Sequence, residues 1–133
     1  MTRRTLVIAT SFAVVFAGIG TIGAQQAGFK RVPLQKNDVS GVAGRESVLA
    51  RGEFDPGASV GKHTHPGDEV AYVLEGEVMF QVEGKPPATL KAGESLFVPA
   101  GTVHAAKNAS KAPAKVLSTY IVEKGKPLAT PVK

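Results

Sequence analysis

The sequence of 133 residues contains no cysteine, no tryptophan and only three histidines. Without cysteine, the chain forms neither disulfides nor metal sites built on thiolates. Charged residues make up 20% of the chain and hydrophobic residues 43%, a composition that excludes a disordered protein and supports one small packed domain. Stability must therefore come from an apolar core, or from a metal ion held by other side chains.

A stretch without charged residues runs from Thr5 to Ala24, directly after Arg3 and Arg4. A basic start, an apolar centre and closing small residues are typical of an export signal, and we expect cleavage after Ala24. An uncleaved membrane anchor is the alternative, because about 20 apolar residues can span a bilayer. The two arginines suit twin-arginine export as well as general secretion. The sequence thus predicts a periplasmic or secreted protein that contacts a membrane only if the signal is retained.

The net charge becomes small once the predicted signal, residues 1–24, is removed. The whole chain has 16 basic and 11 acidic residues, and the signal contains two arginines and no acid, which leaves 14 basic residues and a net charge of +3. The lysines are scattered and are not interleaved with aromatic residues, unlike those of a nucleic-acid-binding surface. We therefore expect a small-molecule ligand or substrate and no nucleic acid.

Short apolar runs in the mature chain alternate with glycine, proline, asparagine and aspartate, and no amphipathic helix lasts three turns. This pattern predicts an antiparallel barrel or sandwich of short strands at residues 45–123. Residues 25–44 are interpreted as an N-terminal leader, and residues 124–133 as a mobile tail rich in lysine and proline. The expected strands are Glu46–Phe54, Val60–His65, Glu69–Leu74, Glu77–Val82, Ala88–Leu90, Ser95–Val98, Val103–Asn108 and Lys115–Val122.

Two of the expected strands differ in how their apolar residues are distributed. In Glu77–Val82, the side chains of Val78, Phe80 and Val82 share one face, which predicts one buried and one solvent-facing side. Glu69–Leu74 is apolar on both faces. We expect this strand to be covered on both sides, by the barrel interior and by a second sheet or subunit, and hence we expect a homodimer.

All three histidines occupy positions from which they can converge. His63 and His65 are two residues apart, so their side chains point to the same face of a strand. Glu69 follows a Pro66-Gly67-Asp68 turn that can bring the next strand back beside them. His104 begins a later strand, after another turn that contains proline and glycine. The pattern is typical of a chain that uses its histidines to bind one metal ion.

Two longer motifs contain these residues. They are Gly57-x5-His63-x-His65-x3-Glu69-x6-Gly76 and Gly93-x5-Pro99-x-Gly101-x2-His104-x3-Asn108. With every spacing intact, they resemble the two sequence motifs of the cupins and cover about half of the mature domain. The resemblance implies a small all-β protein, an antiparallel jelly-roll β-barrel, with one divalent metal bound by His63, His65, Glu69 and His104. We expect the glycines to permit tight corners and Asn108 to hydrogen-bond the backbone.

Three imidazoles and one carboxylate suit Fe, Mn, Ni, Co, Cu or Zn, and an octahedral ion would keep two positions open for water, substrate or dioxygen. The neighbours of the ligands on the same strand faces, Ala71, Val73 and Ala106, are small and leave room for a ligand. No histidine remains to act as general acid or base. The other proton carriers are Tyr72, Tyr120, Glu53, Glu77 and Lys62.

Three functions stay open at this point. The first, which we favour, is a metal-dependent dioxygenase or related oxidoreductase that acts on a small chelating enol, phenol or thiol. Resemblance to quercetin-type dioxygenase cupins would allow Glu69 to act as a base. The second is a lyase, decarboxylase or isomerase that uses the ion as a Lewis acid. The third is a non-catalytic module that captures a metal or a small carboxylate outside the cytoplasm.

Overall fold

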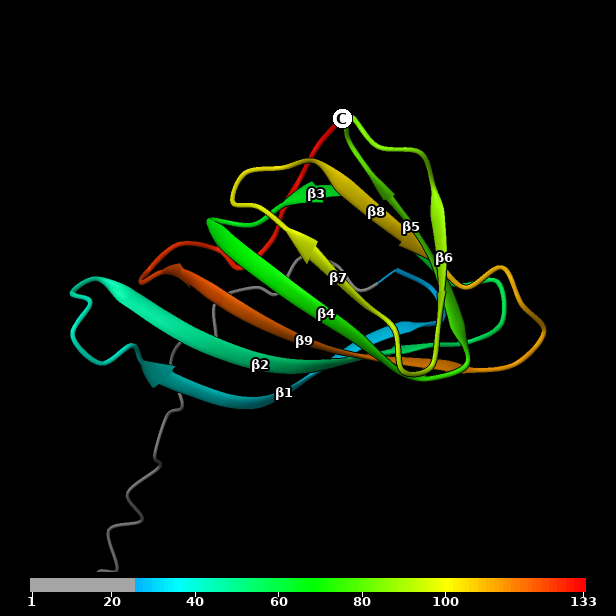
Figure 1. Cartoon of the computed structure of the whole chain (residues 1–133), viewed down its shortest axis with the longest axis horizontal. Helices are drawn as coiled ribbons and strands as arrows, with labels where there is room; N and C mark the ends of the chain where they lie inside the picture. Colours follow the sequence, from blue (N-terminus) through cyan, green and yellow to red (C-terminus); the bar gives the residue numbers. More distant parts are fainter. Residues whose placement is uncertain (1–25) are drawn as a thin grey trace, which may run out of the picture.

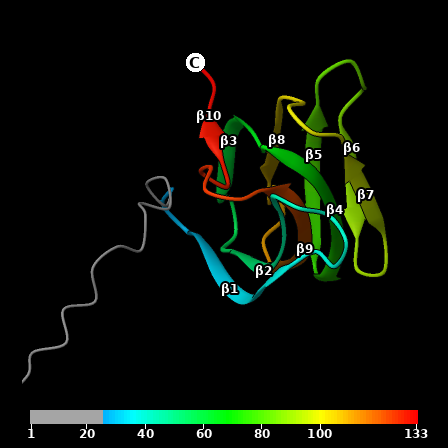
Figure 2. The same cartoon turned by 90° about the vertical axis from the view of Figure 1, so that its left-hand side faces the viewer.

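The computed structural model describes residues 26–133, where the regular elements are all β-strands (Figures 1 and 2). The predicted export signal, residues 1–24, lies outside the described residues. Within residues 26–133, no helix has the length and apolar character needed to cross a membrane.

Ten strands within residues 26–133 form two five-stranded antiparallel sheets. In the first sheet, of order β1-β2-β9-β4-β7, the strands are β1 Phe29–Asp38, β2 Arg45–Phe54, β4 Gly67–Glu75, β7 Ser95–Val98 and β9 Ala114–Glu123. In the second, of order β10-β3-β8-β5-β6, they are β3 Ser59–Thr64, β5 Glu77–Val82, β6 Ala88–Lys91, β8 His104–Lys107 and β10 Thr130–Pro131. The predicted all-β antiparallel class is confirmed, and β2 to β9 match the eight expected strands with ends that differ by at most two residues.

The inner faces of the two sheets pack against each other and form the core. Its buried residues come from both sheets: Phe54, Ala58, Ala71, Val73, Val78, Phe80, Ala106, Ala114 and Val116. On β5, Val78, Phe80 and Val82 are all buried, which confirms the predicted one-sided burial of this strand. The removal of these side chains from water is the main source of stability in a domain without disulfides.

The opposite face of β4 has no cover within residues 26–133. Val70, Tyr72 and Leu74 are between 44 and 49% exposed. Phe97 of β7 lies opposite Val70, and Ile121 of β9 lies opposite Asp68; both are exposed as well. We call Val70, Tyr72, Leu74, Phe97 and Ile121 the outer apolar face. The barrel interior covers β4 on the side of Ala71 and Val73, as expected. Cover of the other side by a second sheet is not found within residues 26–133, and cover by a second subunit stays a prediction.

β1 is a strand that the sequence pattern does not predict, since it lies in the segment interpreted as a leader. It pairs with β2 from Phe29 opposite Phe54 to Asp38 opposite Glu46, with a register shift between Pro33 and Gln35. A proline is tolerated here because β1 is an edge strand. The proline and the shift break the alternation of residue types by which a strand is recognised.

The C-terminal segment also differs from its expected behaviour as a mobile tail. β10 pairs with β3, with Thr130 opposite Thr64 and Pro131 opposite His63 (Figure 2). The backbone N–H of Val132 donates to the carbonyl of Lys62 at 2.9 Å. The lysine and proline content of the segment suggests mobility. Backbone pairing with β3 nevertheless holds this short strand, and amino-acid composition does not reveal such pairing.

Asn108 ties together the turns at one end of the barrel. Its side chain is fully buried, with 0% exposure. The amide nitrogen donates to the carbonyls of Asp55 at 3.2 Å and Ala112 at 2.7 Å. The amide oxygen accepts from the backbone N–H and the hydroxyl of Ser110, at 3.1 and 2.7 Å. These contacts confirm the prediction that Asn108 satisfies backbone groups.

Replacing Asn108 by alanine should lower the free energy of unfolding by about 3 kcal/mol, because buried carbonyl groups lose their donors. Urea denaturation of the metal-free protein measures the effect without a contribution from ligand binding. Ser110→Ala is the control, and it should cost about 1 kcal/mol because the amide donors of Asn108 stay in place. Equal losses in the two variants would contradict a central role for Asn108.

Candidate metal centre

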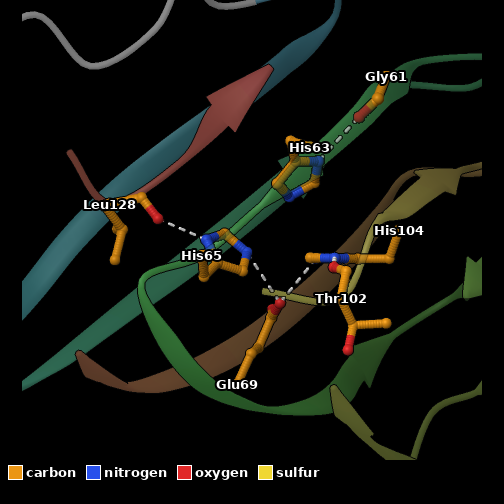
Figure 3. Close-up of polar contacts among 7 residues, drawn as sticks. All are labelled: Gly61, His63, His65, Glu69, Thr102, His104 and Leu128. Atoms are coloured by element: carbon orange, nitrogen blue, oxygen red, sulfur yellow. Dashed lines mark hydrogen bonds and ion pairs between the residues drawn. The ribbon is translucent and has the colours of Figure 1, made fainter. Parts of the chain in front are cut away.

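Four side chains from both sheets converge inside the barrel (Figure 3). His63 lies on β3, His65 one residue beyond its end, Glu69 on β4 and His104 on β8. Pairing of β3 with β8 puts His63 directly opposite His104. The turn at Pro66 then carries the chain into β4 of the other sheet, which brings Glu69 back toward the histidines. All four side chains belong to residues that are between 3 and 7% exposed.

The side-chain atoms of these four residues lie close together. One ring nitrogen of each histidine lies within 4.8 Å of those of the other two. The Nε2 atoms of His65 and His104 each lie 3.1 Å from Oε2 of Glu69. The ring centroids of His63 and His104 are 4.2 Å apart. The structure therefore brings together all four residues that the sequence singles out.

Each histidine ring is oriented by a backbone carbonyl (Figure 3). Nδ1 of His63 lies 2.8 Å from the carbonyl oxygen of Gly61. Nδ1 of His65 lies 2.5 Å from that of Leu128, and Nδ1 of His104 lies 2.9 Å from that of Thr102. A carbonyl oxygen only accepts hydrogen bonds, so the hydrogen of each neutral ring resides on Nδ1 and the Nε2 atom carries a lone pair. Three lone pairs and a carboxylate oxygen thus face one another with no donor between them.

This cluster of acceptors has the properties expected of a metal-binding site. The Nε2 atom of His65 is buried and has no hydrogen-bond partner among residues 26–133, although Oε2 of Glu69 lies 3.1 Å away. Two ligand atoms bound at right angles to one ion, each about 2.1 Å from it, are about 3 Å apart. A proton can bridge only one pair of these atoms, whereas a metal ion can satisfy the whole cluster. The donor set therefore fits a divalent transition metal.

Two of the side chains have pKa values that suit metal binding. Burial lowers the pKa of His63 to about 4, although its contact with the Gly61 carbonyl acts in the opposite direction. Burial disfavours the charged form of Glu69, but a proton on Nε2 of His104 or His65 that bridges to the carboxylate outweighs this effect and holds the pKa of the carboxyl well below its usual range. At neutral pH, His63 is neutral and Glu69 is ionised, which are the forms that bind metal ions.

A cavity of about 40 Å³, partly open to solvent, adjoins the cluster. His63, Glu69 and His104 contribute to its wall, and so does Ala106, one of the small residues expected there. Ala71 and Val73 belong instead to the packed core. The rest of the wall is mainly apolar, with Phe54, Val60, Phe80 and Val116 among the lining residues. Such a wall excludes water around a ligand next to the cluster.

Tyr120 is the proton carrier that the structure places in this cavity. Its ring centroid lies 4.7 Å from that of His65, and the side chain is buried. Burial raises the pKa of the Tyr120 hydroxyl above its usual value, and the nearby charge of Glu69 adds to this effect. The phenol is therefore protonated at neutral pH. By contrast, Tyr72 lies on the outer apolar face, and Glu53 is paired with Arg51 at 2.7 Å.

Two contributions to the site come from outside the predicted barrel and were missed by the sequence analysis. The carbonyl of Leu128 orients His65, and Arg31 of β1 lines the cavity. The only signal for Arg31 is the alternation Phe29-x-Arg31-x-Pro33, which places these residues on one face of β1. No sequence signal identifies Leu128, because every residue type offers a backbone carbonyl.

The fold and the three converging histidines define a small β-barrel protein with a site that can hold a metal ion. The model of the cupin domain family matches residues 50–120, which is more than half of the chain. The chain belongs to the cupin family. Among solved structures, a conserved protein with a double-stranded β-helix domain from Klebsiella pneumoniae has a TM-score of 0.65 at 22% identity, covering 84% of this chain and 90% of that one. This similarity confirms the predicted jelly-roll barrel.

Two curated relatives match part of the chain. A germin-like protein (subfamily 2 member 2) from Arabidopsis thaliana is 46% identical over 77 residues, which cover 54% of this chain and 35% of the relative. An oxalate-binding protein from Thermotoga maritima is 36% identical over 76 residues, which cover 56% of this chain and 62% of the relative. The chain thus spans less than two thirds of either relative.

Replacing His104 by alanine should abolish stoichiometric metal in the purified protein, because one of the inward-facing Nε2 atoms is lost. Elemental analysis of protein from its native compartment measures the metal content, for which we expect about one ion per wild-type chain. Lys107→Ala, an exposed position on the same strand, is the control and should keep its metal. A folded His104→Ala variant with the wild-type metal content would show that the ligand assignment is wrong.

Proposed function

We propose that this chain binds one divalent transition-metal ion through His63, His65, Glu69 and His104. The observation that carries the proposal is the convergence of three Nε2 lone pairs and a buried carboxylate on one point. Three nitrogens and one oxygen suit Fe, Mn, Ni, Co, Cu or Zn. Four protein ligands leave an octahedral ion with open positions, which a small chelating molecule from the adjoining cavity can occupy.

We further propose dioxygenase-like oxidoreductase chemistry on a small chelating enol, phenol or thiol. A redox-active metal ion supplies Lewis acidity and electron transfer to dioxygen when it is bound. The apolar wall of the cavity excludes water from the substrate. Glu69 is the only acidic residue among those described to line the cavity, so its carboxylate would take up a substrate proton after leaving the metal ion. Tyr120 keeps its proton and can donate a hydrogen bond to a substrate oxygen.

A Lewis-acid reaction is the second candidate, in the form of an elimination, a decarboxylation or an isomerisation. The observation that favours it is the presence of a protonated phenol, Tyr120, and a carboxylate, Glu69, in the same cavity. Such a pair can give and take a proton without dioxygen. Binding without turnover is the third outcome, and it agrees with the name of the relative from Thermotoga maritima, an oxalate-binding protein.

We propose that the outer apolar face binds a second copy of this chain. Three ion pairs lie on the same side of the sheet: Arg51–Glu53 at 2.7 Å, Lys115–Glu75 at 2.8 Å and Arg45–Glu123 at 3.9 Å. Because each of these three positive charges has its partner within the face, an identical copy would not have to neutralise them. A twofold axis would pair the apolar side chains of one copy with those of the other.

We also propose that the protein acts outside the cytoplasm, in the periplasm or after secretion. The proposal is supported by residues 1–24, whose basic start, uncharged centre and small closing residues are typical of an export signal. Cleavage after Ala24 would leave a mature chain that begins at Gln25.

Oxygen uptake by the metal-loaded full chain tests the proposed activity. With catechol, acetylacetone and cysteamine as phenol, enol and thiol probes, we expect uptake by the Fe, Mn, Ni or Cu forms. No uptake is expected from the Zn form or from metal-free His104→Ala. Turnover under nitrogen by the Zn form would favour the Lewis-acid reaction instead. If the probes perturb the visible spectrum of the Co form but no form turns them over, the protein is a binding module and the oxidoreductase proposal is wrong.

Native mass spectrometry of protein from its native host tests export and assembly together. We expect a dimer whose protomer mass corresponds to residues 25–133. Tyr72→Lys should give monomers, because it places a charge in the outer apolar face. Gln81→Lys, on the exposed side of β5, is the control and should stay dimeric. A protomer that begins at Met1 contradicts signal cleavage, and a wild-type monomer contradicts the dimer.

A further inference from the structure

Arg31 brings a positive charge into the cavity beside the candidate metal centre. It lies on the inner face of β1, opposite Gly52 of β2, which has no side chain to occupy the space. Its Cζ atom lies 5.7 Å from the ring centroid of Phe29 and 6.0 Å from that of Tyr120. Tyr120 in turn packs against His65. Arg31 and three of the four candidate ligands, His63, Glu69 and His104, line the same cavity as Tyr120.

The guanidinium of Arg31 has no ionic partner among residues 26–133. The guanidinium packs against the rings of Phe29 and Tyr120. Because cation–π attraction does not use the N–H groups, these remain able to donate hydrogen bonds. The other arginines in this part of the chain are paired, Arg45 with Glu123 and Arg51 with Glu53. A guanidinium has five donors in a planar arrangement that matches a carboxylate. Arg31 is thus equipped to bind an anion that the protein itself does not supply.

The charges around the cavity also indicate the kind of ligand. Glu69 is the only described acidic residue in the wall, and the proposed metal site uses its charge. A divalent ion, one carboxylate and three neutral histidines would carry a net charge of +1, and Arg31 adds a second positive charge. A ligand with one negative charge would neutralise only half of this. A dianion with one charge near each positive centre would neutralise both.

We propose that Arg31 is a specificity-determining residue that binds the distal carboxylate of a small dicarboxylic acid. The other end of this acid, a 2-hydroxy or 2-oxo carboxylate, would chelate the metal ion. Two parallel N–H···O bonds from the guanidinium would hold the distal carboxylate, an arrangement that lysine cannot reproduce. This inference rests on the proposed metal site, but it does not depend on the type of reaction.

The test uses ligands that share a chelating end and differ in the distal group. Malate and 2-hydroxyglutarate carry a second carboxylate, whereas lactate and 2-hydroxybutyrate do not. Calorimetric titration of the metal-loaded full chain measures each dissociation constant. In the wild type, at least one of the two diacids should bind roughly tenfold or more tightly than its monoacid partner, as expected for a charged hydrogen-bonded pair.

Arg31→Gln should remove this preference by weakening the diacids more than the monoacids, and it should leave the metal content unchanged. Arg31→Lys should keep only part of the preference, since the bidentate contact is lost. Lys30→Gln is the matched control: it removes the same charge one residue away, at an exposed position whose cross-strand partner is Glu53, on the other face of β1. This variant should behave like the wild type.

Each outcome separates this inference from the proposed metal site. A wild-type protein without metal, seen by elemental analysis before any ligand is added, would disprove the metal site and this inference with it. A metal-loaded wild type that binds diacids and monoacids equally would disprove the role of Arg31 alone. So would a folded Arg31→Gln variant that retains the diacid preference. If thermal unfolding shows that Arg31→Gln does not fold, a full wild-type preference in Arg31→Lys overturns the bidentate contact.

Discussion

The structure depends on one electrostatic constraint, the meeting of four hydrogen-bond acceptors inside the barrel. Carbonyls of Gly61, Thr102 and Leu128 fix the three rings so that their Nε2 lone pairs point inward toward Glu69. Buried acceptors that face one another repel, and a carboxylate increases the cost. Because the candidate ligands come from β3, the residue just beyond it, β4 and β8, a cation at this point would link the two sheets as well as satisfy the side chains. Metal binding at this point would therefore be coupled to barrel stability.

The position of Glu69 is set by a close contact between backbones. A Cβ atom on Gly67 would lie 1.9 Å from the carbonyl oxygen of Ile121, so only glycine lets β4 begin this close to β9. Two residues later, Glu69 lies opposite Tyr120 in the β4–β9 ladder, with both side chains directed inward. The same contact thus places the carboxylate beside the histidines and the phenol beside the carboxylate. The turn residues around Gly67 are part of the site, although they contribute no ligand.

Features encoded within a few residues could be predicted from the sequence. Alternation along β5, the two-residue spacing of His63 and His65, and the turn before Glu69 determine local side-chain direction, and these predictions agree with the structure. β1 could not be predicted, because Pro33 and the register shift beside it interrupt the alternation of residue types. β10 could not be predicted, because it is two residues long and is defined by pairing with the distant strand β3. Leu128 orients His65 through its backbone carbonyl, and since every residue type has this group, the sequence does not indicate the contact. From the sequence alone, Arg31 is indistinguishable from an arginine on the surface. Its position opposite Gly52 and its place in the cavity wall show that it faces the cavity.

Residues that contribute to the cavity and the candidate metal centre lie both inside and outside the segment that matches the cupin family. The cupin match spans residues 50–120 and contains all four candidate ligands, but Arg31 lies before it and Leu128 after it. The conditions for holding a metal ion are thus mostly encoded within the motif region. The charge at the far side of the cavity is encoded by an edge strand outside that region. An edge strand pairs on one side only, so its residues can change with little disturbance to the core. Ligand preference can therefore vary among proteins that share the same metal-binding residues, and similarity over the motif region does not determine it.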